Sequence, residues 1–260
     1  MNGITWMKYL ILFIVAFLPS IVYIIWIRNT ERYEREPWFR IGATFVWGAV
    51  FGVILGVLFS VILMVVFGLA LPERLYDAIS ENESYSTILL VCIIAPIAEE
   101  AAKGLGVFTA GRDLDEVEDG LVYGASVGLG FAATENLLYE YVALTTAGFA
   151  AFVVTAIVRS ISSALLHASA TSATGYGIAK KKVLGPGNHI IPYYLLAVLM
   201  HATFNFLAVI GIIFAGNAGA ALFGLLVAIM FAVAAIEFTR NKIHQLDVSH
   251  LTREKWRRYI

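Results

Sequence analysis

The sequence predicts an all-α membrane protein, a polytopic bundle of about seven transmembrane helices. Hydrophobic residues occupy 60% of the 260 positions and the mean hydropathy is +0.80, values far above those of a soluble domain. Several apolar stretches reach the roughly 20 residues that a helix needs to cross a bilayer core. No stretch shows the alternation of a β-strand. We therefore expect the lipid bilayer to surround most of the chain, as a multi-pass protein of the cell membrane.

The predicted helices follow one another with short connections. The first is too long for a signal peptide, and no small-residue cleavage site precedes the charged segment 28–40, so we expect it to be retained. We expect one membrane domain over residues 1–240, interrupted by the acidic connection Pro72–Ser86, and a basic cytoplasmic tail over residues 241–260. The helices are predicted at Trp6–Ile27, Ile41–Leu69, Thr87–Ala110, Gly120–Tyr141, Ala147–Tyr176, His189–Ala215 and Ala218–Thr239.

The distribution of lysine and arginine predicts the orientation, because cytoplasmic connections carry an excess of both. Most of the 18 basic residues follow the first, third, fifth and seventh predicted helices. Outside the membrane, the alternate side holds only Lys8 and Arg74. We therefore expect the N-terminus outside and the C-terminus in the cytoplasm, with the acidic connection Pro72–Ser86 facing outward.

Charge and cysteine content exclude several kinds of site. The formal net charge is -1 without a dominant basic face, so nucleic acid is not expected as a partner. Cys92 is the only cysteine and lies in an apolar run, which excludes an internal disulfide and a cysteine zinc site. The His-Glu-x-x-His signature of metalloproteases is also absent.

The third predicted helix carries ionisable residues at membrane depth, where an unpaired charge costs at least about 2.5–3.5 kcal/mol. Glu99 and Lys103 are four residues apart and share a face, so an ion pair is geometrically natural. Glu100 projects about 100° round the helix, which leaves one carboxylate unbalanced. Pro96 cannot donate a hydrogen bond to the Cys92 carbonyl, so we expect a kink and a local polar pocket there.

The fourth predicted helix carries small residues at regular spacing. Gly120, Gly124 and Gly128 recur every fourth position, which lets a neighbouring backbone approach closely. Asp119 is expected to cap the N-terminus of this helix. We therefore expect tight packing of this helix against a neighbour.

Helices four to six bring further polar groups to the same region. Glu135 and Arg159 reach comparable depths, so they either pair structurally or Glu135 takes a catalytic or metal-binding role. His167 lies on the fifth predicted helix, and His201 and Asn205 share a face of the sixth. Glutamates and histidines gathered within one membrane region predict a functional centre.

This set of residues is suited to peptide hydrolysis. A buried glutamate can take a proton from water, a histidine can orient that water, and an asparagine amide can stabilise an oxyanion. The same carboxylates and imidazoles are also ordinary ligands of a divalent metal such as zinc, which would activate the water. The residues alone leave both mechanisms open.

The spacing of these residues forms a combination of motifs between residues 88 and 205. The motifs are Glu99-Glu100-x-x-Lys103, Asp119-Gly120, Gly128-x-Gly130-Phe131-Ala132-x-x-Glu135-Asn136, His167 and His201-x-x-x-Asn205. Together they resemble the PrsW family of intramembrane proteases, which is related to the CAAX prenyl endopeptidases and the Abi proteins.

The resemblance implies an intramembrane endopeptidase that cleaves a membrane-bound protein. Its catalytic residues would be Glu99, Glu100, Glu135, His167, His201 and Asn205. Asn205 would be the oxyanion partner. Glu135 stands where the prenyl enzymes carry a histidine and Lys103 where they carry an arginine, which argues against prenylated substrates. A single-pass membrane protein is the expected substrate, with an anti-sigma-factor-like regulator as one candidate, because the founding family member cleaves such a factor.

Two alternatives come from other functional classes. The first is a non-catalytic scaffold resembling the anterior-pharynx-defective subunit of gamma-secretase, in which buried pairs only hold helices together. The second is an ion-coupled transporter, although no inverted repeat is visible. The polar centre holds more carboxylates than its permanent cations need for pairing, which favours the enzyme.

Overall fold

The protein is described by a computed structural model over residues 3–214 and 216–258. Within these ranges every regular element is helical and no strand is present, which confirms the predicted all-α class. In chain order the elements are α1 (Gly3–Arg28), α2 (Trp38–Trp47), η1 (Gly48–Gly52), α3 (Val53–Ala70), α4 (Glu73–Ser80), α5 (Glu83–Ile88), η2 (Leu89–Ile94), α6 (Ala95–Val107), η3 (Phe108–Asp113), α7 (Asp119–Ala147), α8 (Phe149–Ile161), α9 (Ser163–Leu184), α10 (Ile191–Ile213) and α11 (Ala218–Arg258).

Five helical stretches in the described part of the chain are long and apolar enough to cross a membrane. They are Trp6–Arg28, Trp38–Ala70, Phe149–Leu184, Ile191–Ile213 and Ala218–Ser249. The other two predicted spans, Thr87–Ala110 and Gly120–Tyr141, are also helical, as α5 to η3 and as α7, but they carry the charged residues of the centre. Ala215, predicted to end the sixth span, lies outside the described residues, as do residues 259–260 of the predicted tail.

Two local predictions are wrong. The acidic connection Pro72–Ser86 is helical in place of irregular, because it forms α4 and the start of α5. Residues 241–258 of the expected tail are also helical and continue α11 without a break. Asp119 does not cap α7, because the capping position is Glu118 and no side chain makes a capping hydrogen bond there. The Asp119 carboxylate is used elsewhere, as described below.

Helix α7 runs through the interior of the bundle, and its glycines bring it against α9, as the sequence predicts. A Cβ atom on Gly128 would lie 2.2 Å from the His167 carbonyl oxygen, and one on Gly124 would lie 2.5 Å from that of Thr171. The two backbones are therefore in direct contact, so no larger side chain fits at these positions. This contact fixes the place of His167 relative to the carboxylate that α7 carries.

The outer helices present apolar side chains to their surroundings. On α3 only Gly56 is buried, whereas Val57, Val61 and Val65 are exposed. Long rows of exposed apolar residues also cover α1, α10 and α11. Such surfaces are stable in lipid and not in water, which agrees with a multi-pass membrane protein.

A π-helical stretch precedes Pro96, in place of the simple kink that the sequence predicts. In η2 the hydrogen bonds skip to the fifth residue, so the partner of the Val91 carbonyl would be Pro96, which has no N–H. Asn205 of α10 supplies the missing donor, with its Nδ2 atom 2.8 Å from the Val91 oxygen. The freed carbonyl is thus that of Val91 and not of Cys92.

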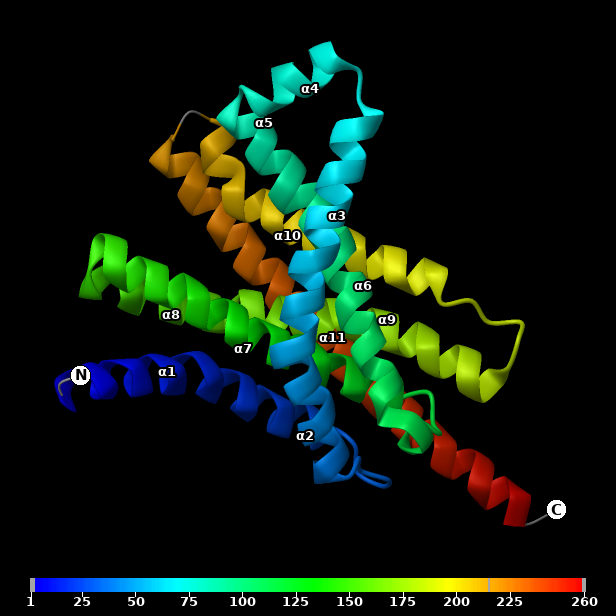
Figure 1. The fold of residues 1–260 in the computed structure, drawn as a ribbon. Coiled ribbons are helices and arrows are strands. Elements are labelled where there is room, and N and C mark those ends of the chain that lie inside the picture. The colour runs from blue at the N-terminus through cyan, green and yellow to red at the C-terminus, as the bar shows by residue number, and fades with distance from the viewer. Residues whose placement is uncertain (1–2, 215, 259–260) are drawn as a thin grey trace.

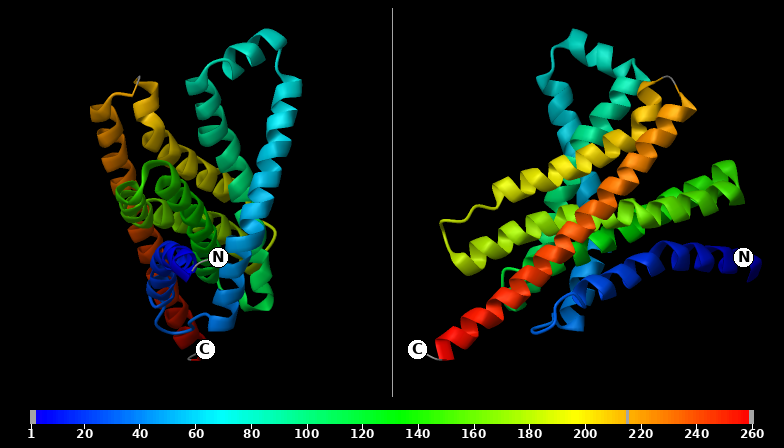
Figure 2. Two further views of the ribbon diagram at one scale, coloured as in Figure 1. Left: turned by 60° about the vertical axis from the view of Figure 1, so that its left-hand side comes forward. Right: turned by 180° about the vertical axis from the view of Figure 1, so that it is seen from behind.

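The long helices cross at different angles (Figure 1). Helix α4 and the connection between α10 and α11 lie at one end of the molecule, and the α1–α2 connection and the end of α11 lie at the other, as the two further views also show (Figure 2). The predicted fifth helix is divided at Ser162 into α8 and α9, which places Arg159 and His167 on separate segments. The helices that carry polar residues meet near the middle of the bundle.

Candidate active site

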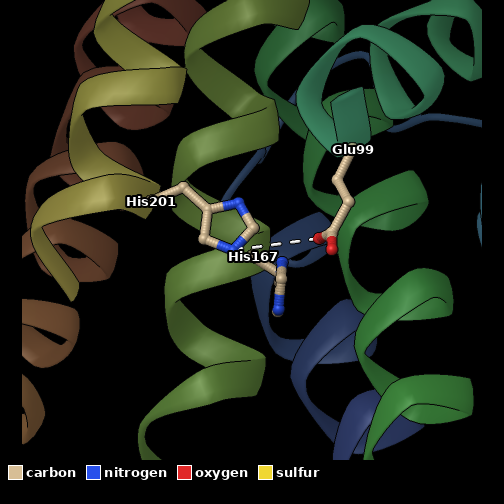
Figure 3. A group of neighbouring side chains, drawn as sticks. All are labelled: Glu99, His167 and His201. Atoms are coloured by element: carbon tan, nitrogen blue, oxygen red, sulfur yellow. Dashed lines mark ion pairs between the residues drawn. The ribbon is translucent and has the colours of Figure 1, made fainter. Parts of the chain in front are cut away.

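Four helices bring the predicted site residues together. Figure 3 shows Glu99 of α6, His167 of α9 and His201 of α10 pointing toward one another. One ligand atom from each lies within 4.8 Å of the corresponding atoms of the other two. Glu135 of α7 joins them through His167, whose Nε2 atom is 2.8 Å from Glu135 Oε2. Residues separated by up to 102 positions in the sequence thus form one cluster.

Glu100 is fully buried, and both of its carboxylate oxygens accept hydrogen bonds from neighbouring side chains. Lys103 Nζ donates to its Oε1 at 2.5 Å and the Thr171 hydroxyl donates to its Oε2 at 3.1 Å. His201 Nδ1 lies 3.0 Å from the same Oε1. The predicted pair of Lys103 with Glu99 is present at 3.9 Å, but the short contact is with Glu100. Glu100 is therefore balanced by a cation and held in place by its neighbours.

Glu99 is the carboxylate that is left unbalanced. Its side chain is 17% exposed, and its buried Oε2 atom has no hydrogen-bond partner. The nearest imidazole atom is His201 Nε2, at 3.8 Å. Glu100 accepts a hydrogen bond from the Nδ1–H group of His201, so the neutral imidazole has an unprotonated Nε2. Two acceptors, Glu99 Oε2 and His201 Nε2, therefore face each other without a donor between them.

A series of polar contacts links Lys103 to Arg159 through His167 and Glu135. Lys103 Nζ is 2.9 Å from His167 Nδ1, and because an ammonium group only donates, that nitrogen accepts. The neutral ring then carries its proton on Nε2 and donates it to Glu135. Glu135 also pairs with Arg159 at 2.8 Å, so the predicted Glu135–Arg159 pair is confirmed. Glu135 thus combines a structural pair with a direct contact to the centre.

Arg159 is itself held by Asn136, which belongs to one of the sequence motifs, and by two residues that the sequence did not single out. Its Nε donates to Asn136 Oδ1 at 2.8 Å and its NH2 donates to the Ser163 hydroxyl at 3.0 Å. The Tyr139 ring lies 3.9 Å from the guanidinium carbon. The Glu135-Asn136 motif was the available signal for Asn136, whereas Ser163 and Tyr139 had none.

Asn205 lies one turn beyond His201 on α10, but its side chain makes a structural hydrogen bond. Its amide donates to Val91 O, as described above. One amide N–H remains for a further acceptor. The structure therefore brings five of the six predicted residues into one contact network and ties the sixth to η2.

The network borders a cavity of about 490 Å³ on the side of α3. Glu99, Glu135 and Phe131 line it together with apolar side chains of α3 such as Val57 and Val61. These α3 residues belong to the exposed apolar surface, so the cavity connects the carboxylates with the lipid-facing side of the bundle.

The residues fit a metal such as zinc, as the sequence allowed. Glu and His are ordinary zinc ligands, and bonds of about 2.0–2.2 Å reach two atoms up to roughly 4 Å apart. Glu99 Oε2 and His201 Nε2 meet this condition at 3.8 Å. Glu100 on the other nitrogen of His201 is the carboxylate that commonly orients a metal-binding histidine. His167 would join by exchanging its contact with Lys103 or Glu135.

Comparisons with known proteins point to one family. A family model described as PrsW family intramembrane metalloprotease matches residues 36–236. Protease PrsW of Clostridioides difficile (strain 630) is 29% identical over 207 residues, covering 76% of this chain and 79% of the relative. Protease PrsW of Geobacillus kaustophilus (strain HTA426) is 29% identical over 194 residues, covering 73% and 76%. No solved structure matches the chain.

The matched range contains every predicted site residue, from Glu99 on α6 to Asn205 on α10. The matches support a protease and give no support to the scaffold alternative. Because the family model covers most of the chain, the protein belongs to the PrsW family of intramembrane proteases.

Proposed function

We propose that the protein is an intramembrane endopeptidase that hydrolyses a peptide bond of a single-pass membrane protein, with Glu99 and His201 activating the water. The observation that carries this proposal is the pair of unsatisfied acceptors, Glu99 Oε2 and His201 Nε2, separated by 3.8 Å beside the cavity. A water molecule between them can donate one hydrogen to each. Its oxygen lone pairs then face the cavity where a substrate carbonyl would lie.

In the proposed reaction the water oxygen attacks the carbonyl carbon while its proton passes to Glu99 or His201. The resulting tetrahedral oxyanion collapses, the C–N bond breaks, and the same proton is returned to the leaving amine. Glu100 and Thr171 act as positioning residues, because they hold His201 in the tautomer that keeps Nε2 free. The second amide N–H of Asn205 is proposed as the oxyanion contact.

We further propose that a divalent metal such as zinc is held by Glu99, His201 and His167. When bound it would act as a Lewis acid and lower the pKa of the attacking water. The support is the donor set and the Glu100–His201 contact behind it. Glu135 would remain the group that accepts a hydrogen bond from His167 and keeps that ring oriented.

The substrate is expected to enter from the lipid through the 490 Å³ cavity between α3 and α7. A transmembrane helix bonds its own carbonyls, so it must unwind locally before water can attack. Glycine, proline or small polar residues near the cleaved bond should therefore speed cleavage. An anti-sigma-factor-like regulator remains one candidate substrate of this kind.

The test uses the full chain reconstituted with a single-pass reporter that carries a glycine pair within its span. Glu99→Gln and His201→Ala should abolish cleavage while the protein still inserts and unfolds at the wild-type temperature. Glu81→Gln is the matched control, because Glu81 is an exposed carboxylate at the end of α4. Cleavage at wild-type rates in both active-site variants would remove this pair from the mechanism.

A second arm separates the two mechanisms. Activity lost in a chelator and restored by zinc supports the metal, whereas unchanged activity in metal-free protein leaves water activation to Glu99 and His201 alone. Product termini mapped by mass spectrometry should lie within or beside the reporter span. Cuts confined to a soluble ectodomain would contradict entry through the lipid-facing cavity.

We also propose that the N-terminus and α4 face outward and that the α1–α2 connection and the end of α11 face the cytoplasm. The support is the excess of lysine and arginine in the second group of segments. Single cysteines placed at Glu81 and at Asn188 in a Cys92→Ala background test this with an impermeant thiol reagent. In intact cells we expect labelling of the cysteine at position 81 and not of the cysteine at position 188, which follows the basic end of α9. The opposite result would show that the orientation is reversed.

A further inference from the structure

A second buried cluster of carboxylates lies at the other end of α7. Glu31 and Glu36 come from the connection between α1 and α2, and Asp119 is the first residue of α7. Their exposed fractions are 1%, 4% and 2%, and one oxygen of each lies within 4.8 Å of the others. We call these three residues the acidic cluster. Asp119 precedes Glu135 by 16 residues, about 24 Å along the helix, so the cluster is separate from the active site.

No basic side chain balances the acidic cluster within the described part of the chain. The neighbouring arginines bind other groups: Arg28 donates to the Glu36 backbone oxygen at 2.5 Å and Arg35 to the Glu31 backbone oxygen at 2.8 Å. Neither arginine forms an ion pair with a carboxylate of the cluster. Three acidic groups removed from water without a counter-charge require protons or a bound cation.

Each carboxylate is held by one oxygen, and two of them leave the other oxygen free. Tyr123 OH donates to Glu36 Oε2, and Glu36 N donates to Glu31 Oε2 at 3.4 Å. Asp119 Oδ2 accepts from the backbone N–H groups of Asp115 and Glu116 at 2.8 and 2.6 Å. The second oxygens, Glu31 Oε1 and Glu36 Oε1, are buried and have no hydrogen-bond partner. Carboxylates oriented from behind, with free oxygens, are arranged as ligands.

A polar cavity of about 220 Å³ leads to the cluster. Glu36 and Asp119 share its lining with further acidic residues, among them Asp113 and Asp115, and with one basic residue, Arg35. A cavity lined mostly by carboxylates attracts cations and offers the entry path that a metal site needs.

We propose that Glu31, Glu36 and Asp119 bind a hard divalent cation of the Ca²⁺, Mg²⁺ and Mn²⁺ class. The ligands are all oxygens, which these cations prefer and which zinc or copper sites in proteins seldom use alone. Ca²⁺–oxygen bonds of about 2.3–2.6 Å join oxygens up to roughly 5 Å apart, and the 4.8 Å limit of the cluster lies within this span. The bound cation ties the α1–α2 connection to the start of α7.

The competing state is a protonated cluster. Burial and the neighbouring carboxylates raise the pKa of Glu36 to about 11 and that of Glu31 to about 9 in the absence of a cation. Neutral acids in these places would need no metal. A measurement of cation binding separates the two states.

The test uses the full chain in detergent, stripped with a chelator, and titrated separately with Ca²⁺, Mg²⁺ and Mn²⁺. We expect a saturable site for at least one of these cations, seen by Mn²⁺ electron paramagnetic resonance or calorimetry, together with a rise in unfolding temperature. Glu36→Gln and Glu31→Gln should each weaken binding at this site at least about tenfold. Glu99→Gln removes a ligand of the proposed active-site metal, so the site that this variant retains is the one assigned to the acidic cluster. Glu34→Gln removes a charge from the cavity lining and no ligand, so it should weaken binding less than Glu36→Gln or Glu31→Gln does.

Wild-type protein alone can overturn the proposal. If it binds none of the three cations saturably at neutral pH, the cluster holds protons and not a metal. Equal affinity of Glu36→Gln, Glu31→Gln and wild type would place any binding elsewhere. If one glutamine variant fails to fold, the other and Asp119→Asn provide the same comparison. Proteolytic activity is not part of the readout, so failure here leaves the proposed function untouched.

Discussion

Two buried groups of carboxylates lie along α7, and they differ in how their charge is balanced. At the active site Lys103 pairs with Glu100 and Arg159 pairs with Glu135, so the chain supplies its own cations. In the acidic cluster no lysine or arginine of the described residues forms an ion pair with the carboxylates, and Arg28 and Arg35 donate to backbone oxygens instead. Two of the three active-site carboxylates are thus paired within the chain and only Glu99 is left over, whereas every carboxylate of the acidic cluster lacks a cation from the described residues.

The two groups also differ in the surroundings of the carboxylate oxygens that have no hydrogen-bond partner. At the active site the pairing leaves Glu99 Oε2 free beside a histidine and a cavity that faces lipid, which suits chemistry on a membrane-bound substrate. In the acidic cluster the unpartnered oxygens of Glu31 and Glu36 lie among other carboxylates, and Glu36 and Asp119 line a polar cavity. Burial alone therefore does not identify an active site, and the identity of the neighbouring groups decides its use.

The largest effect is expected from Glu99→Gln. The amide keeps the shape but cannot accept the proton of water, so the cleavage rate should fall by about 10²–10⁴. The unfolding temperature should stay within the range of wild type, because Glu99 has no short structural partner. Rates of reporter cleavage measured beside thermal unfolding check this. If Glu99→Gln lost as much stability as Lys103 variants do, Glu99 would be a structural carboxylate like Glu100, and this prediction would be wrong.

Lys103→Met tests the internal balance of charge. The change leaves the fully buried Glu100 without its cation, and the free energy of unfolding should fall by about 3–5 kcal/mol. The double variant Lys103→Met, Glu100→Gln should recover part of this loss, because no unpaired charge remains. Lys181→Met, at an exposed position near the end of α9, is the control. Equal stability of the single and double variants would contradict the pairing.

Gly128→Ala tests whether the α7–α9 contact places His167 against Glu135. The added Cβ would lie 2.2 Å from the His167 carbonyl oxygen, so the helices must separate, at a cost of about 3 kcal/mol and with loss of cleavage. Gly187→Ala is the matched control, because a Cβ there meets no atom within 4 Å. Chemical unfolding and cleavage are measured together. Wild-type stability of the Gly128 variant would show that the helices can shift without cost.

The smallest effect is expected from Tyr123→Phe, which removes the hydroxyl that orients Glu36. The affinity of the acidic cluster for its cation should fall by about tenfold, the lower end of what loss of such a supporting contact causes. Proteolysis at saturating cation should not change, because Tyr123 lies three turns from Glu135 on α7. Cation titration of the variant and wild type provides the measurement, and a change in cleavage without a change in affinity would contradict the separation of the two regions.

Much of the fold follows from local properties of the sequence. Apolar length and the absence of strand patterning determine the helical ranges, because backbone groups in lipid must be satisfied within the helix. The four-residue spacing of Gly120, Gly124 and Gly128 predicts the close contact with a neighbour. The charges at Glu99, Glu100 and Lys103 are costly in a membrane, which marks their helix as the one that carries the centre.

Other features depended on which helices meet. Lys103 lies near both carboxylates on its own helix, but it is closer to Glu100 than to Glu99. Glu100 is the carboxylate that also contacts Thr171 and His201 on other helices. Asn205 serves the Val91 carbonyl only because α10 packs against η2. The acidic cluster joins residues 31 and 119, which no local spacing connects. Sequence thus determined where polar groups enter the membrane and its edge, and tertiary packing decided their partners, because hydrogen bonds and ion pairs act over a few ångströms between segments distant in the chain.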